Sequence, residues 1–270
     1  MYSYVGLTTL KTELGLTGDK NDVLLRNLAE TVARQFDEHL GRTFRSYLAT
    51  RYYTPRSSQR LLLDGDLLSV TTLKSDEDGD RVYETTWAAG DYDLMPFNAA
   101  ADKRPYWEIA VTPDGDHWFQ PVRRGVEVVG KWGYWEDLVT VTSLAAEALD
   151  ATETGVDVDN GGDFEPLQTI LVDAEQMYVT GINSNTLTVV RAVNGTTAAT
   201  HLDNAVIQVY RYPWQVAKAA ILHATKMWAR RSAGYSDRAG MVDTGLVPIR
   251  EGMDWAVVDL LAFAHRLAAV

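Results

Sequence analysis

The sequence of 270 residues contains no cysteine. That absence excludes a disulfide framework, a cysteine nucleophile and a metal site built on thiolates. The sequence also lacks any apolar run near the roughly 20 residues of a membrane-spanning helix. Its first residues, Met1 to Tyr4, lack the basic-then-apolar order of a secretory signal. We therefore expect a soluble protein that is made in the cytoplasm and has no membrane partner.

Positive charge is also scarce, since Lys and Arg total 25 against 37 Asp and Glu and the net charge is -12. This balance argues against a general duplex-DNA binder, because such binding comes from cations that neutralise phosphates. The net charge is +3 in residues 1–60 and again in 206–270, but -9 in 61–137 and -9 in 138–205, where Arg191 is the single basic residue. The shared character of the two ends predicts that they fold together around an inserted middle.

Helical periodicity marks the start of the chain. A short helix is predicted over Leu10–Leu14 and stops at Gly15. A helix of about twenty residues is predicted to begin after the capping residue Asp19 and to end at Gly41. The evidence for it is a set of apolar residues that recur every three or four positions: Leu25, Leu28, Val32, Phe36 and Leu40.

The end of the chain has the same periodicity. A helix is predicted to begin at Pro213, because proline fits the first turn of a helix, and to end at Gly234. Arg230 and Arg231 favour its C-terminus electrostatically. Its apolar stripe consists of Val216, Ala220, His223 or Ala224, Met227 and Trp228.

Between these helices the pattern alternates with period two, which is typical of strands. We interpret 61–137 as a β region packed on or extending from a helical core of 1–60 plus 206–270, and 138–205 as an inserted, autonomous small β-barrel or sandwich. Leu138–Ala151 is interpreted as a linker, and Asn194-Gly195 as a hairpin turn. The fold class is therefore α+β. The expected strands cover 67–73, 82–86, 107–112, 125–132, 169–173, 176–182, 186–193 and 206–210.

Two acidic loops could hold a hard cation. Asp76, Asp78 and Asp80 have the spacing of a calcium loop, but Arg81 stands where that loop needs glycine and Trp87 where it needs glutamate, so a hairpin turn is the favoured interpretation. The second loop contains Asp157, Asp159, Asn160 and Asp163 beside Gly161-Gly162, and it is also interpreted as a surface turn.

Other catalytic patterns fail on inspection. There is no phosphate-binding loop and no dinucleotide fingerprint, and the segment Gly234 to Arg238 lacks the second glycine of a nucleophile elbow. Asn194-Gly195-Thr196 matches a glycosylation sequon but has no secretory signal to accompany it. A pair of carboxylates across a cleft stays possible among 37 acidic residues. We expect no enzyme activity, no metal and no cofactor. The isolated histidines are His39, His117, His201, His223 and His265.

The C-terminal segment is unusually apolar. From Asp254 to Val270, 13 of 17 residues are apolar, so a helix there would be apolar nearly all round and must be buried. Two interpretations stay open: a core helix of the terminal bundle, or a helix that docks on another subunit or another protein. The residues predicted to dock are Trp255, Leu260, Leu261, Phe263 and Arg266.

The order of several short phrases resembles the head–tail connector (adaptor) proteins of tailed bacteriophages. The likeness covers residues 5–137 and 206–240, and residues 138–205 are an insertion that smaller members lack. The phrases are the helix Leu10–Leu14, the acid-capped helix that ends at Leu40-Gly41-Arg42, the strands Leu63–Thr71, Asp91–Pro96 and Val126–Gly133, and the helix ending Trp228–Arg231.

The resemblance implies a helical core and a homo-oligomeric ring, dodecameric in that family, which docks under the portal protein in the virion neck. Such a ring extends the DNA channel and offers a platform to the next neck or tail protein. If residues 61–205, with a net charge of -18, line the channel, they would let double-stranded DNA pass without tight binding; the alternative is a solvated acidic exterior. The alternative function is a tail-completion or baseplate protein with a carbohydrate-binding β module. The aromatic residues that such a module needs are few in 138–205, where only Phe164 and Tyr178 occur.

Overall fold

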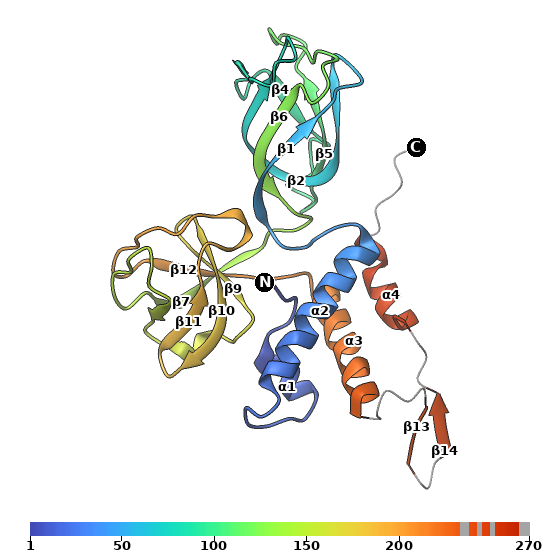
Figure 1. Cartoon of the computed structure of the whole chain (residues 1–270), viewed down its shortest axis with the longest axis vertical. Coiled ribbons are helices and arrows are strands. Elements are labelled where there is room, and N and C mark those ends of the chain that lie inside the picture. Colours follow the sequence, from blue (N-terminus) through green and yellow to red (C-terminus); the bar gives the residue numbers. More distant parts are fainter. Residues whose placement is uncertain (233–237, 242–244, 249–251, 265–270) are drawn as a thin grey trace. The chain divides into compact units, whose positions relative to one another are not determined.

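The computed structural model describes residues 1–232, 238–241, 245–248 and 252–264 (Figure 1). The chain divides into two compact units. Unit one comprises residues 1–41, 137–193 and 197–270, and unit two comprises residues 42–136 with 194–196. Across the described ranges, the helices together with antiparallel sheets make the fold class α+β. None of the described helices combines the length and the apolar character that crossing a bilayer requires.

The helices of unit one come from both ends of the chain. Gly41 ends α2 in the left-handed conformation at φ 63°, as the sequence predicts. α3 begins directly after Pro213, and its predicted stop at Gly234 lies outside the described residues. The helices are α1 (Leu7–Glu13), α2 (Asp22–Leu40), α3 (Trp214–Ser232) and α4 (Trp255–Leu261), and α4 continues into a 3-10 turn at Ala262–Ala264.

The helices pack as the apolar stripes predict. α2 lies against α3 and α1, and α4 lies against α3. Leu25, Val32 and Phe36 of α2 are fully buried. The N-terminal segment is held to the same helix, because the hydroxyls of Tyr2 and Tyr4 both donate to the carboxylate of Asp37. The first and last parts of the chain therefore share one core.

Unit one also contains a six-stranded antiparallel sheet in the order β7-β12-β9-β10-β11-β8. The predicted linker Leu138–Ala151 was wrong in its first half, since residues 138–144 form β7 and pair with β12. The sheet of this fully described domain is open and forms no closed barrel. Two isolated bridges lie outside its strands, between Ala145 and Val158 and between Leu149 and His201. The strands are β7 (Leu138–Leu144), β8 (Gly155–Asp157), β9 (Thr169–Val172), β10 (Glu175–Asn183), β11 (Thr186–Val190) and β12 (Val206–Tyr210).

The predicted hairpin turn at Asn194-Gly195 was also wrong. β11 pairs with β10 and β8, whereas β12 pairs with β7 and β9, so no hairpin joins β11 to β12. Residues Val193–Gly195 instead form a short 3-10 turn in which Asn194 has φ 56°. The side-chain oxygen of Asn194 accepts a hydrogen bond of 2.6 Å from Arg45, and both residues belong to unit two.

The β7–β12 domain is packed on α1 and α2. The backbone N–H of Leu7 donates to the Pro166 carbonyl at 2.9 Å, and the N–H and hydroxyl of Thr9 donate to Glu165 at 3.0 and 3.1 Å. The hydroxyl of Tyr178 donates to Glu30 of α2 at 3.2 Å. The domain is therefore attached to the helices by specific side-chain and backbone contacts, in addition to the chain connection from β12 to α3.

Unit two holds the second six-stranded sheet, in which β3 pairs with β2 and the other strands run β1-β6-β2-β5-β4. Residues 42–60 were assigned to the helical core from sequence; instead they contain β1, which pairs along its whole length with β6. β2 runs through Asp64-Gly65, and its register with β5 shifts across this dipeptide, between Leu62 and Leu67. The strands are β1 (Tyr47–Tyr53), β2 (Arg60–Ser75), β3 (Thr85–Thr86), β4 (Tyr92–Met95), β5 (Tyr106–Val111) and β6 (Val126–Trp132).

A short hairpin follows α3, with β13 (Arg238–Met241) paired to β14 (Gly245–Pro248). These two strands were not predicted from the sequence. β13 and β14 pair only with each other among the described strands.

Candidate functional site

The predicted docking helix is split between two environments. Leu261 of α4 is fully buried and faces the chain's own core together with Val257 and Ala264. Trp255 is 77% exposed and Phe263 is 43% exposed, while Leu260 is partly buried. Arg266 lies outside the described residues. The core interpretation therefore holds for the face that bears Leu261, and docking remains a prediction for the face that bears Trp255.

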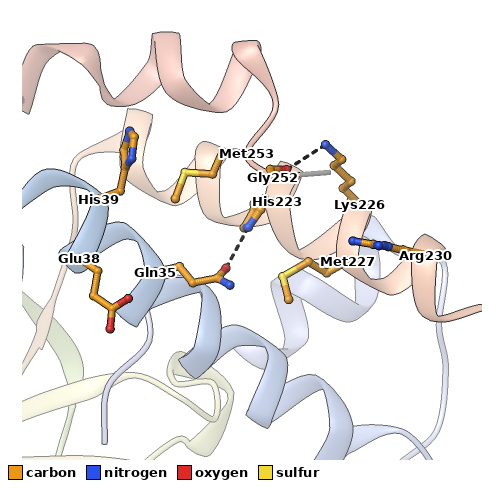
Figure 2. Close-up of a pocket in the computed structure, with 9 residues that line it drawn as sticks. All are labelled: Gln35, Glu38, His39, His223, Lys226, Met227, Arg230, Gly252 and Met253. Carbon is orange, nitrogen blue, oxygen red and sulfur yellow. Dashed lines mark hydrogen bonds between the residues drawn. The ribbon is translucent and has the colours of Figure 1, made fainter. Parts of the chain in front are cut away.

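A pocket of about 480 Å³ lies beside this helix in unit one. It is bounded by the C-terminal half of α2, by the C-terminal half of α3 and by the residues that precede α4 (Figure 2). Its size falls within the range of small-molecule and side-chain pockets. The lining residues are Gln35, Glu38, His39, His223, Lys226, Met227, Arg230, Gly252 and Met253.

His223 forms the inner wall of the pocket. It is only 5% exposed, its Nε2 lies 3.0 Å from Oε1 of Gln35, and its ring lies 6.0 Å from that of Phe36. Burial, and secondarily the charge of Lys226, lowers the pKa of His223 below its ordinary value, so the ring is neutral at physiological pH. With Nε2–H donated to Gln35, Nδ1 is left as a buried acceptor without a hydrogen-bond partner.

The other lining groups combine cations with sulfur. Lys226 donates to the carbonyl of Gly252 at 3.1 Å and so ties α3 to the residues before α4. An ammonium group has three N–H donors, and this bond uses one of them. Arg230 adds a second positive charge, and Met227 and Met253 contribute polarisable thioethers. Six of the nine lining residues are polar or charged, and the two methionines are the apolar part of the lining.

This pocket was not predicted from the sequence. The signal was present only in part: His223 and Met227 were placed on an apolar stripe, and Arg230 was interpreted as a helix-terminal charge. The contacts that create the pocket join α2 to residues about two hundred positions later. Spacing within one helix cannot reveal such a site.

The first candidate cation loop uses its carboxylates to hold its own backbone. The ligand oxygens of Asp76, Asp78 and Asp80 lie within 4.8 Å of one another. The carboxylate of Asp76 accepts from the N–H groups of Gly79 at 2.7 Å and Arg81 at 3.0 Å. Burial raises the pKa of Asp76, but these backbone donors outweigh it and the net direction is downward. The geometry matches the predicted turn.

In the second loop the acidic side chains contact different partners. Asp159 accepts from the N–H of Leu144 at 3.0 Å, and Asp163 accepts from the side chain of Asn160 at 2.9 Å. The side-chain oxygen of Asn160 in turn accepts from the N–H of Gly162 at 3.1 Å. These bonds shape the short 3-10 turn Gly161–Asp163.

A buried charge network in the β7–β12 domain was not anticipated. Glu175 is 1% exposed and pairs with Arg191 through two bonds of 2.7 Å. It also accepts from the N–H groups of Ala192 and Ala199 at 3.0 Å, and its Oε2 lies 3.0 Å from Nε2 of His201. Burial raises the pKa of Glu175, but the bonds from Arg191, His201 and the backbone outweigh it and bring the pKa to about 2.

The remaining donors of Arg191 are also used inside the domain. They contact the carbonyls of Asp150, Glu153 and Ala199 at 2.9, 2.9 and 2.6 Å. The single basic residue of 138–205 is therefore a structural group that holds the connection between β11 and β12.

No protein-family model and no curated protein sequence matches the chain. Among solved structures, the chain is similar to a chain of the neck of an empty GTA particle computed with C6 symmetry. The sequence identity is 11%, the alignment covers 99% of this chain and 92% of that chain, and the TM-score is 0.46.

Proposed function

We propose that the chain is a structural protein of the neck of a tailed phage or phage-like particle, and that it assembles into a connector ring under the portal protein. In this role it extends the DNA channel and presents a platform to the next neck or tail protein. It has no catalytic activity and needs no cofactor. The ring is dodecameric in the family that the sequence resembles.

The observation that carries this proposal is the packing of the two chain ends. α2 and α3 lie together, and the bond between Gln35 and His223 joins residues 188 positions apart. The phrases on which the family resemblance rests lie on α1, α2 and α3 and on β2, β4 and β6. A helical core from the two ends, interrupted by β domains, supports a connector.

The exposed face of α4 is the proposed docking element. Its inner face is already occupied by the chain's own core through Leu261, so the outer face with Trp255 is what remains for the portal or a neighbouring subunit. Burying one large apolar side chain contributes about 1.5–3 kcal/mol, and a ring repeats that contribution in every subunit.

The charge distribution supports passage of DNA without tight binding. Residues 61–205 together have a net charge of -18. A wall with this charge would repel phosphates over a screening length of about 8 Å at physiological salt. The proposal therefore predicts weak, salt-sensitive contacts and no stable complex with duplex DNA.

Electron microscopy of the purified protein and of isolated particle necks tests the function. The expected result is a ring coaxial with the portal. Trp255→Ala should fail to join the neck, whereas Val23→Ala, which changes an exposed apolar residue on α2 instead, should behave as the wild type. A protein that is monomeric alone and absent from the neck contradicts the proposal.

The two aromatic residues that a carbohydrate-binding module would use are buried. Phe164 is 7% exposed and Tyr178 is fully buried, so neither aromatic ring of 138–205 can stack on a sugar. Nothing observed in this module favours that function.

A further inference from the structure

We propose that His201 and Asp173 form a proton-sensitive clip in the β7–β12 domain. The clip is closed while His201 carries a proton on both ring nitrogens, and it opens when the ring loses one of them. The inference concerns this domain alone and does not depend on the proposed neck function.

His201 is a buried imidazole between two carboxylates. It is 3% exposed, its Nδ1 lies 2.7 Å from Oδ2 of Asp173, and its Nε2 lies 3.0 Å from Oε2 of Glu175. An ionised carboxylate only accepts hydrogen bonds, and a neutral imidazole has a single N–H to donate. The ring must therefore carry both protons to donate to Asp173 and Glu175 at the same time.

The two carboxylates differ in what they lose when the ring becomes neutral. Glu175 is 1% exposed, and its pKa of about 2 keeps it ionised wherever a histidine titrates. A buried carboxylate that loses a donor has no water to replace it, so the remaining proton stays on Nε2 and the bond to Glu175 persists. The side chain of Asp173 is 65% exposed, and water can replace His201 there. The bond to Asp173 is therefore the one that breaks.

The clip joins two separate parts of the domain. Asp173 lies in the tight turn between β9 and β10, at φ 51°. His201 lies in the connection from β11 to β12, and its backbone exchanges two hydrogen bonds of 3.0 Å with Leu149. Because this backbone pairing holds His201, loss of the proton releases the turn and leaves the connection in place.

The other charged groups near the ring are already paired. Arg191, which follows β11, shares the Oε2 atom of Glu175 with His201. Asp150, next to Leu149, accepts from the N–H and hydroxyl of Thr152, and Asp203 accepts from the side chain of Asn204. Asp173 is thus the carboxylate whose hydrogen bond depends on the second proton of His201.

Hydrogen exchange of the full-length protein tests the clip. Its stabilisation is present while His201 is protonated and is lost as the pH rises, so the protection of the amides in β9 and β10, corrected for the intrinsic effect of pH, should decrease. We expect a decrease of about 5-fold between about pH 5.5 and about pH 8.5 in the wild type. Asp173→Asn should remove the decrease, because its amide group can accept from Nδ1–H or donate to the neutral Nδ1.

Asp203→Asn is the matched control, since it removes an exposed carboxylate two residues after His201 and should keep the wild-type decrease. His201→Gln keeps a donor for Glu175 but cannot titrate, so it should also lose the decrease. If circular dichroism shows that His201→Gln is unfolded, Asp173→Asn decides alone. Protection that is equal at the two pH values in the wild type, or a decrease that Asp173→Asn retains, overturns the proposal.

Discussion

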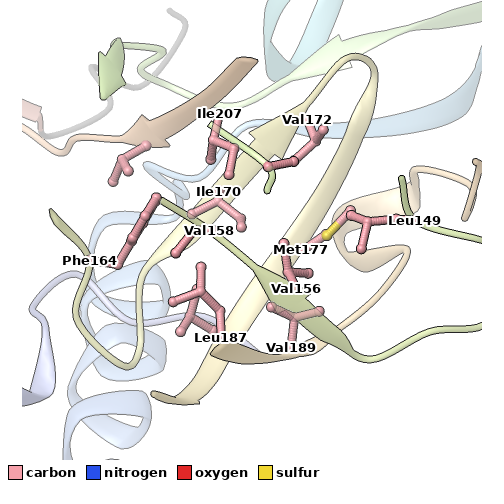
Figure 3. Close-up of a cluster of buried hydrophobic side chains, with 13 residues drawn as sticks. Leu149, Val156, Val158, Phe164, Ile170, Val172, Met177, Leu187, Val189 and Ile207 are labelled. Carbon is pink, nitrogen blue, oxygen red and sulfur yellow. The ribbon is translucent and has the colours of Figure 1, made fainter. Parts of the chain in front are cut away.

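The two six-stranded sheets of the molecule differ in what fills their cores. The core of the β7–β12 domain is aliphatic: of its thirteen clustered residues only Phe164 is aromatic (Figure 3). The core of the β1–β6 sheet contains four aromatic residues, and the rings of Trp87 and Phe119 stack with centroids 4.7 Å apart. The indole N–H of Trp132 donates to the carbonyl of Ala49 at 2.9 Å.

The polar groups of the two sheets differ in the same way. In the β7–β12 domain a carboxylate, Glu175, is buried with Arg191, so part of its stability depends on a charge that can be protonated. The β1–β6 sheet also buries a carboxylate, Glu108, but its partner Arg60 is mostly exposed. Arg51 in this sheet lies over the ring of Trp132 at 4.4 Å, and its partner Asp64 is mostly exposed. We therefore expect acid to weaken the first domain more than the second.

The largest effect is expected from Arg191→Met. It leaves the charge of Glu175 buried without its partner and should lower the free energy of unfolding by about 3–5 kcal/mol. Urea unfolding measures this. Lys131→Met in the other sheet is the control, because the Lys131–Glu136 pair is partly exposed and should contribute less than about 1 kcal/mol. Equal losses of unfolding free energy in the two variants would contradict the expected difference between the sheets.

The same pair predicts a pH dependence. The folded pKa of Glu175 is about 2, below its ordinary 4.5, so its stabilisation is complete above pH 4.5 and is lost as the pH falls towards 2. The difference corresponds to about 3 kcal/mol. Glu175→Gln should remove this part of the pH dependence. The measurement is the unfolding free energy of the wild type and of Glu175→Gln, each at pH 7 and at pH 3. If the difference between the two proteins is the same at both pH values, the prediction is wrong.

The β1–β6 sheet should instead be sensitive to backbone spacing. Gly130 lies in β6, and an added Cβ would lie 2.3 Å from the carbonyl oxygen of Ser69 in β2. Gly130→Ala should therefore cost about 2–3 kcal/mol. Gly90→Ala in the same unit is the control, since nothing lies within 4 Å of its added Cβ. Thermal unfolding distinguishes them, and two equal midpoints would disprove the close approach.

A smaller effect is expected where the β7–β12 domain meets α2. Burial, with the nearby charge of Glu30, raises the pKa of Tyr178, so its hydroxyl remains a donor at neutral pH. Tyr178→Phe removes one hydrogen bond and should cost about 1 kcal/mol. Tyr92→Phe, in the partly buried β4, is the comparison. Hydrogen exchange at β9 and β10 should increase in the first variant only.

The smallest effect concerns repulsion between surface carboxylates. The charges of Asp157 and Glu153 raise the pKa of Glu147, so its ionised form is destabilising at pH 7. Glu147→Gln should slightly raise the unfolding midpoint in low salt. High salt should abolish the gain because it screens the repulsion. A gain that persists in high salt would point to another cause.

Regular periodicity predicted the elements well wherever local pattern and tertiary packing agree. The end of α2 at Gly41 and the strands β9 to β12 follow from repeats of apolar residues and from glycine in the left-handed region. β1 was not predicted because its inward-facing residues include both polar and apolar types, and because its partner β6 lies about eighty positions later in the sequence. Residues 138–144 alternate as a strand should, but their position between two blocks suggested a linker.

The candidate site was predictable only as a helix. Because 13 of the last 17 residues are apolar, the pattern could not say which face of α4 turns inward, and Leu261 was placed with Trp255. The pocket depends on α2, α3 and Gly252-Met253 meeting in space. The sequence also could not show which residue pairs with Arg191, because any of the ten carboxylates in 138–205 could have done so.

The burial of Arg191 has a consequence for the solvent around the β7–β12 domain. With its guanidinium group turned inward, residues 138–205 keep nine carboxylates at the surface and no ammonium or guanidinium group among them. Such a surface gathers sodium or potassium counterions from solution. A partner that approached it with Lys or Arg would release some of these ions, so its affinity would decrease as the salt concentration rises.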